Sequence, residues 1–181
     1  MSINVSIKKA TPFPKKICSH ATFAWKDTIL VWGGKNFETH EEYETSVVFM
    51  YHSREWIRKQ TSGVAPERCS GASHVINDTM YVIDSQMIFA LDLNAWTWSR
   101  FHAIGINSII NYWFIRVPSW VHNDKIYMLG NDPHKLCCYN VEHNSLEWVN
   151  QEGEFPRGYL GVKPILHGDT VIVFGVGGMG T

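Results

Sequence analysis

The stretch Asn77-Asp78-Thr79-Met80-Tyr81-Val82 decides the fold, because its pattern occurs four times in the 181 residues of the chain. Each copy is an X-Asp pair followed by a run of mostly β-branched, aromatic or other apolar residues, and the aspartates are 45 to 51 residues apart. Asn, Asp and Gly tolerate the positive φ that a two-residue hairpin turn demands. The pattern therefore predicts a β-hairpin in each repeat. The other three copies are Lys26-Asp27-Thr28-Ile29-Leu30-Val31, Asn123-Asp124-Lys125-Ile126-Tyr127-Met128 and Gly168-Asp169-Thr170-Val171-Ile172-Val173.

A second pair of strands is predicted after the hairpin in the first three repeats. Residues 89–98 and 139–148 align residue for residue, with an aromatic residue first, Trp98 or Trp148 last and an Asn at the same position in the turn. Residues 48–56, which end in Trp56, are a shorter version. Each repeat is therefore predicted to form four antiparallel strands, and the fold is predicted to be all-β.

A four-stranded unit that recurs about every 47 residues is typical of a β-propeller blade. The strand that ends in Gly33-Gly34, the aromatic strand after it and the Trp at a fixed distance resemble the kelch repeat family. The resemblance covers nearly the whole chain, although the other repeats lack the full glycine pair. It implies a partial kelch-type β-propeller of about three to four blades, in which the last-strand Trp packs between neighbouring sheets.

The resemblance also divides the chain into units. Residues 1–13 are expected to form an outer strand of a preceding or closing blade, 14–60 blade 1, 61–100 blade 2, 101–150 blade 3, and 151–181 the first half of blade 4. An unpaired strand edge is a template for pairing with another chain. A closed four-bladed ring and a homodimer through the open blade edges therefore both remain open.

Charge and composition narrow the function classes. The 16 Lys and Arg residues nearly balance the 17 Asp and Glu residues, so the net charge is -1. This balance argues against a nucleic-acid or membrane-surface binder. Because the N-terminus lacks the order of a secretory signal and no apolar run approaches about 20 residues, we expect a cytoplasmic or nuclear protein. The four cysteines, Cys18, Cys69, Cys137 and Cys138, form no Cys-x-x-Cys pair. Cys18 and Cys69 occupy equivalent positions of the repeat and are therefore expected to be small buried side chains.

No catalytic constellation is recognisable. The sequence contains no Gly-x-Ser-x-Gly, glycine-rich phosphate loop or His-Glu-x-x-His motif. The four repeated aspartates are interpreted as turn residues that hydrogen-bond their own backbone. His122 and His167 share one repeat position beside the turn and are interpreted as structural. We therefore expect no catalytic residue, no cofactor and no metal site.

Four cations are each expected to open the first strand of a blade, just after the loop from the preceding Trp strand: Lys16, Arg68, Arg116 and Arg157. In kelch propellers the first strand lines the channel and this loop lies on a face that commonly receives ligands, so the resemblance implies a basic ring at the channel mouth. Arg binds carboxylates through charge-assisted and often bidentate hydrogen bonds. The ring favours an acidic peptide or a C-terminal carboxylate as partner. The alternative is that these side chains cap local carbonyls or lie in solvent.

Two insertions depart from the compact repeat, and such departures often carry a scaffold's specificity. Residues 35–46 form an acidic loop with Phe37 and Tyr43. This loop is either a partner-binding element or a mobile solvated segment. Residues 103–114 are strongly apolar and include Trp113. They either pack on an adjacent blade or contact another chain.

These observations favour non-catalytic recognition of a protein or peptide. The phrases Trp96-Thr97-Trp98-Ser99, Ser19-His20 and Val31-Trp32-Gly33-Gly34 are similar to kelch proteins that act as substrate receptors of cullin-RING ubiquitin ligases. The chain carries no recognisable adaptor-binding segment. The alternatives are a propeller enzyme of the oxidase or nitrile-specifier kind, for which no copper or iron ligand set is found, and a truncated product without independent activity.

Overall fold

The fold is built from β-strands alone. The computed structural model describes residues 10–69, 72–84, 87–105, 118–129, 135–150, 152 and 164–173. Every regular element in these residues is a strand, which confirms the prediction of an all-β fold. Within the same residues there is no helix long and apolar enough to cross a membrane.

Three larger sheets follow one another along the chain, and two-stranded sheets accompany them. The first sheet has the order β2 (Ala21–Trp25), β3 (Thr28–Trp32), β5 (Val47–His52), β6 (Glu55–Gln60). The second has the order β8 (Ala72–Ile76), β9 (Thr79–Asp84), β10 (Met87–Asp92), β11 (Thr97–Phe101), with β7 (Ser62–Gly63) beside β11. The third has the order β12 (Ser119–His122), β13 (Lys125–Leu129), β14 (Leu136–Asn140), β15 (Ser145–Val149). The two-stranded sheets are β1 (Ile17–Cys18) with β4 (Lys35–Asn36) and β16 (Ile165–His167) with β17 (Thr170–Ile172).

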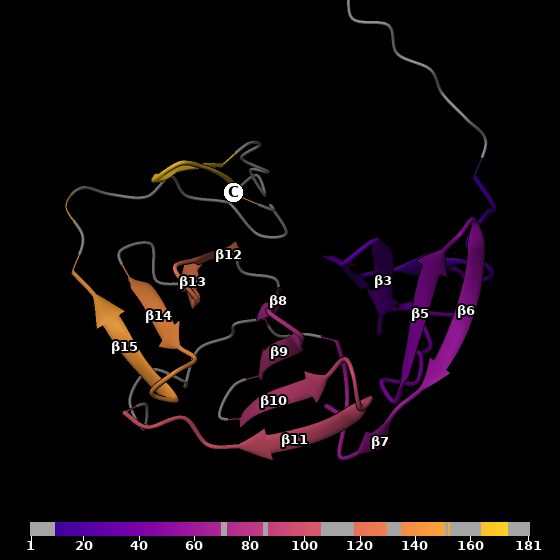
Figure 1. Cartoon of the computed structure of the whole chain (residues 1–181), viewed down its shortest axis with the longest axis horizontal. Helices are drawn as coiled ribbons and strands as arrows, with labels where there is room; N and C mark the ends of the chain where they lie inside the picture. Colours follow the sequence, from indigo (N-terminus) through magenta and orange to yellow (C-terminus); the bar gives the residue numbers. More distant parts are fainter. Residues whose placement is uncertain are drawn as a thin grey trace, which may run out of the picture.

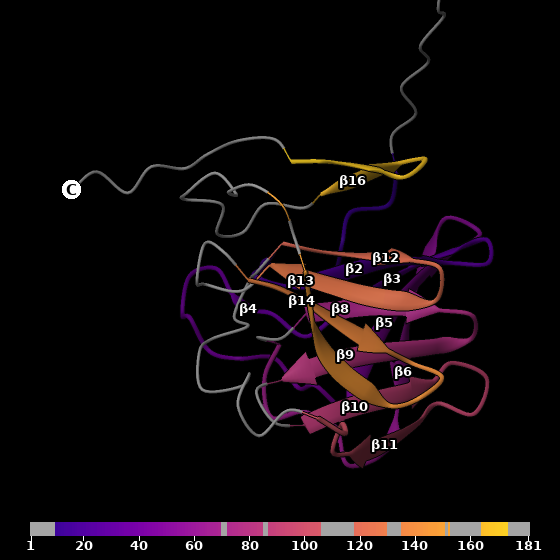
Figure 2. The same cartoon turned by 90° about the vertical axis from the view of Figure 1, so that its left-hand side faces the viewer.

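The three larger sheets follow an arc, with β6, β11 and β15 on its outside (Figure 1). Their first strands are neighbours, because β2 contacts β8, β8 contacts β12, and β12 contacts β16. Figure 2 shows the β16–β17 hairpin above β12. Consecutive units of the repeat therefore lie side by side, with their first strands next to one another.

The repeated X-Asp pairs form the hairpin turns that the sequence predicts. Each pair connects the first two strands of a sheet through a two-residue turn. The first residue of the turn has a positive φ in all four, between 48° and 58°: Lys26, Asn77, Asn123 and Gly168. This backbone twist matches the twist of the flanking strands.

Two hydrophobic cores hold the sheets together, one on each face of the second sheet. Met80 and Val82 of β9 are fully buried against the first sheet. Between them in sequence, Tyr81 packs toward the third sheet, as Ile83 does. This alternation follows from the two-residue period of a strand. Because each fully buried aliphatic side chain contributes roughly 1.5–3 kcal/mol, the second sheet is stabilised from both sides.

The register of the last two strands corrects the alignment of the repeats. The turns 93–96 and 141–144 are equivalent, because each is enclosed by the last pair of its hairpin. Trp98 therefore corresponds to Leu146, two residues before Trp148, and both Trp98 and Leu146 are only 4% exposed. Trp148 is 41% exposed. The expectation that the last-strand Trp is buried between sheets is confirmed for Trp98 and wrong for Trp148.

The segment that leaves each sheet pairs with the last strand of the next one. The amide of Ser62 donates to Trp96 O at 2.9 Å, and the amide of Ile104 donates to Asn144 O at 2.8 Å. A glycine follows each of these residues, and Gly63 has a φ of 78°. A Cβ added to Gly63 would overlap the backbone of Trp98. Glycine is therefore required where this connection crosses the next sheet.

We expect Gly63→Ala to lower the free energy of unfolding by about 2 to 4 kcal/mol, from backbone strain and from the clash with the Trp98 backbone. Gly168→Ala is the matched control, since Gly168 also has a positive φ but an added Cβ meets nothing within 4 Å. It is expected to cost about 1 kcal/mol. Urea unfolding of both variants measures the difference, and equal losses would contradict the close approach at Gly63.

Candidate interaction surface

The insertion between β3 and β5 contains a short strand and makes backbone contacts with a neighbouring segment. Its strand β4 pairs with β1, so that Ile17 lies opposite Asn36 and Cys18 opposite Lys35. The Asn36 side chain accepts hydrogen bonds from the amides of Glu38, at 2.8 Å, and Thr39, at 3.2 Å. These bonds fix the tip of the loop from its own backbone.

The glycine pair at the end of β3 allows two other segments to approach the loop. Gly33 and Gly34 have φ values of 63° and 86°. A Cβ on Gly34 would lie 2.8 Å from Cys18 O, and a Cβ on Gly33 would overlap the side chain of Cys69. The segments that carry Lys16 and Arg68 therefore converge on the two sides of this pair.

The structure brings three of the predicted partner-binding residues together. The Phe37 amide and the Tyr43 hydroxyl both donate to Lys16 O, each at 3.2 Å. The Lys16 ammonium lies 2.6 Å from a carboxylate oxygen of Glu38, and both side chains are exposed. The Phe37 side chain is 67% exposed. These residues form one surface, which we call the loop surface: Lys16, Phe37, Glu38 and Tyr43.

The predicted basic ring is only partly described. Lys16 and Arg68 do not open the first strands of their sheets, because β2 begins at Ala21 and β8 at Ala72. Arg68 is exposed and makes no ion pair with the residues that the structure describes. Its segment is anchored, because the Thr45 hydroxyl donates to Pro66 O. Arg116 and Arg157 lie outside the described residues, as does Trp113. Of the two ring cations in the structure, Lys16 is already paired with Glu38.

A pocket of about 230 Å³ adjoins the loop surface. It opens on the far face of the first sheet, which points away from the second sheet and bears Phe49 and Arg58. The Lys15 ammonium lies 4.3 Å from the centre of the Tyr43 ring and 5.4 Å from that of Phe49. Arg58 pairs with Glu44 at 3.2 Å. Sequence reasoning missed Lys15, Phe49 and Arg58, although the alternation of side chains in β5 and β6 places the last two on one face.

The N-terminal segment lies on the same far face. The Phe13 ring meets Phe49 and Trp56 edge to face, with centroids 5.2 and 4.7 Å apart. The Trp56 indole donates to Thr11 O at 3.1 Å, and the Thr11 hydroxyl donates to Arg54 O at 2.6 Å. Residues 10–13 form no strand, and residues 1–9 of the expected outer strand lie outside the described residues.

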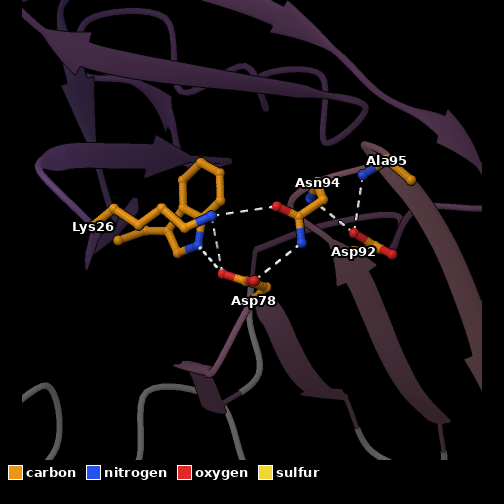
Figure 3. A network of polar contacts seen from close by, with 6 residues as sticks. Lys26, Asp78, Asp92, Asn94 and Ala95 are labelled. Atoms are coloured by element: carbon orange, nitrogen blue, oxygen red, sulfur yellow. Dashed lines mark hydrogen bonds and ion pairs between the residues drawn. The ribbon is translucent and has the colours of Figure 1, made fainter.

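Two of the four turn aspartates, Asp78 and Asp169, contact a neighbouring sheet, whereas Asp27 lies 3.4 Å from His52 of its own sheet. The Asp78 carboxylate accepts hydrogen bonds from the Trp25 indole, at 2.9 Å, and from the side-chain amide of Asn94, at 3.1 Å. The Lys26 ammonium lies 3.4 Å away (Figure 3). The hydrogen bond from Asn94 is the main reason why the pKa of Asp78 is lowered, followed by that from Trp25. Asp78 thus joins the first sheet to the second.

The same contact recurs once more along the chain. His122, which occupies the repeat position of Trp25, lies 3.5 Å from Asp169 of the next hairpin. The prediction that the turn aspartates bond their own backbone is therefore wrong for Asp78 and Asp169. Backbone hydrogen bonds of this kind are made by Asp92, at the turn between β10 and β11. Its carboxylate accepts from the backbone amides of Asn94 and Ala95 (Figure 3).

Three of the four cysteines lie in or against the hydrophobic core: Cys137 and Cys138 are buried in it, and Cys69 packs against the core between the first and second sheets. Burial raises the pKa of the Cys137 thiol to about 12 and also raises that of Cys138. Cys18 and Cys69, which were expected to be buried, are only half-buried, whereas Cys137 and Cys138 are buried. In the part of the chain that the structure describes, no group of three His, Cys, Asp or Glu side chains is placed to hold a metal ion.

Comparison with known proteins does not identify a family for this chain. No protein-family model matches the chain, and no curated protein matches it.

We expect Asp78→Asn to destabilise the protein at neutral pH and to flatten its acid unfolding profile. The lowered pKa of Asp78 means that the carboxylate contributes stability above its ordinary pKa of 3.8, and this is lost as the pH falls through the folded-state value. Urea unfolding from neutral pH to about pH 2 measures the difference. Asp124→Asn is the control at the equivalent turn, and parallel curves for Asp78→Asn and the unmodified protein would contradict the link.

Proposed function

We propose that the chain is part of a kelch-type β-propeller whose function is to bind a protein or peptide without catalysis. The repeated antiparallel sheets support this proposal, because their first strands are neighbours and their last strands lie on the outside of the arc (Figure 1). Blades of four strands arranged in this way are typical of propellers. A substrate receptor of a cullin-RING ubiquitin ligase, in the cytoplasm or nucleus, is the specific form that the kelch resemblance suggests.

The observation that carries the binding role is the exposed Phe37 on an anchored loop. Its ring is 67% exposed, while its amide and the loop around it are fixed by hydrogen bonds to Lys16 and Asn36. Aromatic side chains often dominate interface energies. A loop that is already ordered loses little conformational entropy when a partner binds.

Arg68 gives the proposed partner a chemical preference. Its exposed guanidinium lies in a segment that packs beside Gly33, next to the insertion loop. A guanidinium suits a carboxylate, because it donates two parallel hydrogen bonds. We therefore infer an acidic peptide or a free C-terminal carboxylate as the partner that reaches from Phe37 to Arg68.

We expect Phe37→Ala to weaken peptide binding by a factor of about 10 or more, in line with an aromatic interface residue. The probe is a peptide selected from a random library displayed with a free C-terminus, and fluorescence anisotropy measures its affinity. Arg68→Glu should weaken this peptide more than its C-terminal amide. Ile57→Ala and Arg100→Glu are controls, since both side chains are exposed elsewhere on β6 and β11. Unchanged affinity in both test variants would overturn the proposal.

A second copy of the chain is a further proposed partner. The far face of the first sheet exposes Ile29, at 45%, and the β16–β17 hairpin exposes Ile165 and Ile172, at 55% and 36%. Among the described residues, β17 also has one unpaired edge. Exposed apolar side chains beside an unpaired edge favour association between sheets.

We expect light scattering to give the molar mass of a dimer for the unmodified protein. Ile29→Lys should shift the equilibrium toward the monomer, because it places a charge on the far face. Ile57→Lys is the matched control, since Ile57 is 47% exposed on the same sheet but lies opposite Met50, on the other face. A monomer at all concentrations, or equal effects of the two variants, would contradict dimerisation through this face.

A further inference from the structure

We propose that the pocket on the far face of the first sheet binds a lysine or arginine side chain of a partner, and that Lys15 is its built-in occupant. The Lys15 ammonium already lies over two aromatic rings, 4.3 Å from the centre of Tyr43 and 5.4 Å from that of Phe49. Aromatic faces attract cations at these distances. Lys15 thus marks the position of a cation in this pocket.

Contacts that do not involve the Lys15 side chain hold the two rings. The Tyr43 hydroxyl donates to Lys16 O, and the Tyr43 amide donates to Gly34 O at 2.9 Å. Phe49 is in β5, which is paired with β3 on one side and β6 on the other. The walls of the pocket are therefore preorganised for a cation, whether it comes from Lys15 or from a partner.

The remaining space and charge also suit a cationic side chain. The pocket volume of about 230 Å³ is below the range of drug-sized ligand sites, about 300–1,000 Å³, and suits a single side chain. Glu42 and Glu44 line it, and Arg58 pairs with Glu44 only. Glu42 makes no ion pair with the described residues. An incoming cation would meet two ring faces and this carboxylate.

Lys15 is held weakly enough to be displaced. Its side chain is exposed, its segment forms no strand, and it makes no ion pair within the described part of the chain. An exposed cation–aromatic contact changes an equilibrium by about 2- to 5-fold. A partner cation that also contacts Glu42 therefore competes with Lys15, and removal of Lys15 should strengthen its binding by the same factor.

The test uses three blocked amino acids as probes: N-acetyl-lysine methylamide, N-acetyl-arginine methylamide and the neutral N-acetyl-norleucine methylamide. Amide NMR shifts of residues 42–44 and 49 follow each titration. The two cationic probes should shift these resonances, and the neutral probe should not. The titrations are run at a protein concentration at which light scattering gives the monomer. Because the probes are single residues, the result is then independent of both the peptide binding and the dimer proposed above. Equal shifts with the norleucine probe would overturn the proposal.

Variants of the chain test the role of each wall. Lys15→Ala should tighten binding of the lysine probe about 2- to 5-fold. Lys16→Ala is the matched control and should leave it unchanged, since Lys16 pairs with Glu38 outside the pocket. Tyr43→Leu should abolish the shifts, whereas Tyr43→Phe keeps the ring and should retain them. Equal effects of Lys15→Ala and Lys16→Ala would overturn the proposal even where Tyr43→Leu fails to fold.

Discussion

The burial of the second sheet on both faces is the constraint on which the rest of the structure depends. Met80 and Val82 face one core and Ile83 faces the other, and all three are at most 1% exposed. A sheet with two apolar faces is stable only between two other layers. The repeat in the sequence follows from this requirement, because each unit supplies a face that its neighbour must cover.

Polar contacts then fix how neighbouring units are aligned. Asp78 reaches from the second sheet to Trp25 of the first, and Asp169 of the last hairpin lies beside His122 of the third. At the boundary between them, the equivalent position holds Ile76, which is 5% exposed and belongs to the core. The polar contact is therefore present at two of these boundaries and absent, among the described residues, from the boundary between the second and third sheets.

The hairpins and the four-stranded units could be predicted from the sequence because they depend on local rules. An X-Asp pair before an apolar run specifies a turn and a strand wherever it occurs. The alignment of the last strands could not be predicted in the same way. Trp96 and Asn144 occupy the same position with φ values of 58° and 47°, although their side chains are unrelated. Alignment by residue type pairs Trp98 with Trp148, whereas the backbone geometry of the turns makes Leu146 the equivalent of Trp98.

The candidate site could be predicted only in part, because some of its residues follow a local sequence pattern and others do not. Phe37 and Tyr43 stand out because they interrupt an acidic insertion, and the structure places both beside Lys16. Lys15, Phe49 and Arg58 belong to a segment and two strands whose contacts are set only by the tertiary structure. No local pattern distinguishes Lys15 from Lys16, yet one lies over aromatic rings and the other pairs with a glutamate.

The pocket itself follows from the way the units are connected. At the second sheet the incoming segment is buried, since Thr61 is 8% exposed and accepts a hydrogen bond from the Trp98 indole. At the first sheet Thr11 accepts the equivalent bond from Trp56, but both residues lie near the surface. The same connection that seals one boundary therefore leaves the far face of the first sheet partly open. Space for a partner side chain arises there because, among the described residues, Lys15 and Phe13 cover this face and no further sheet packs on it.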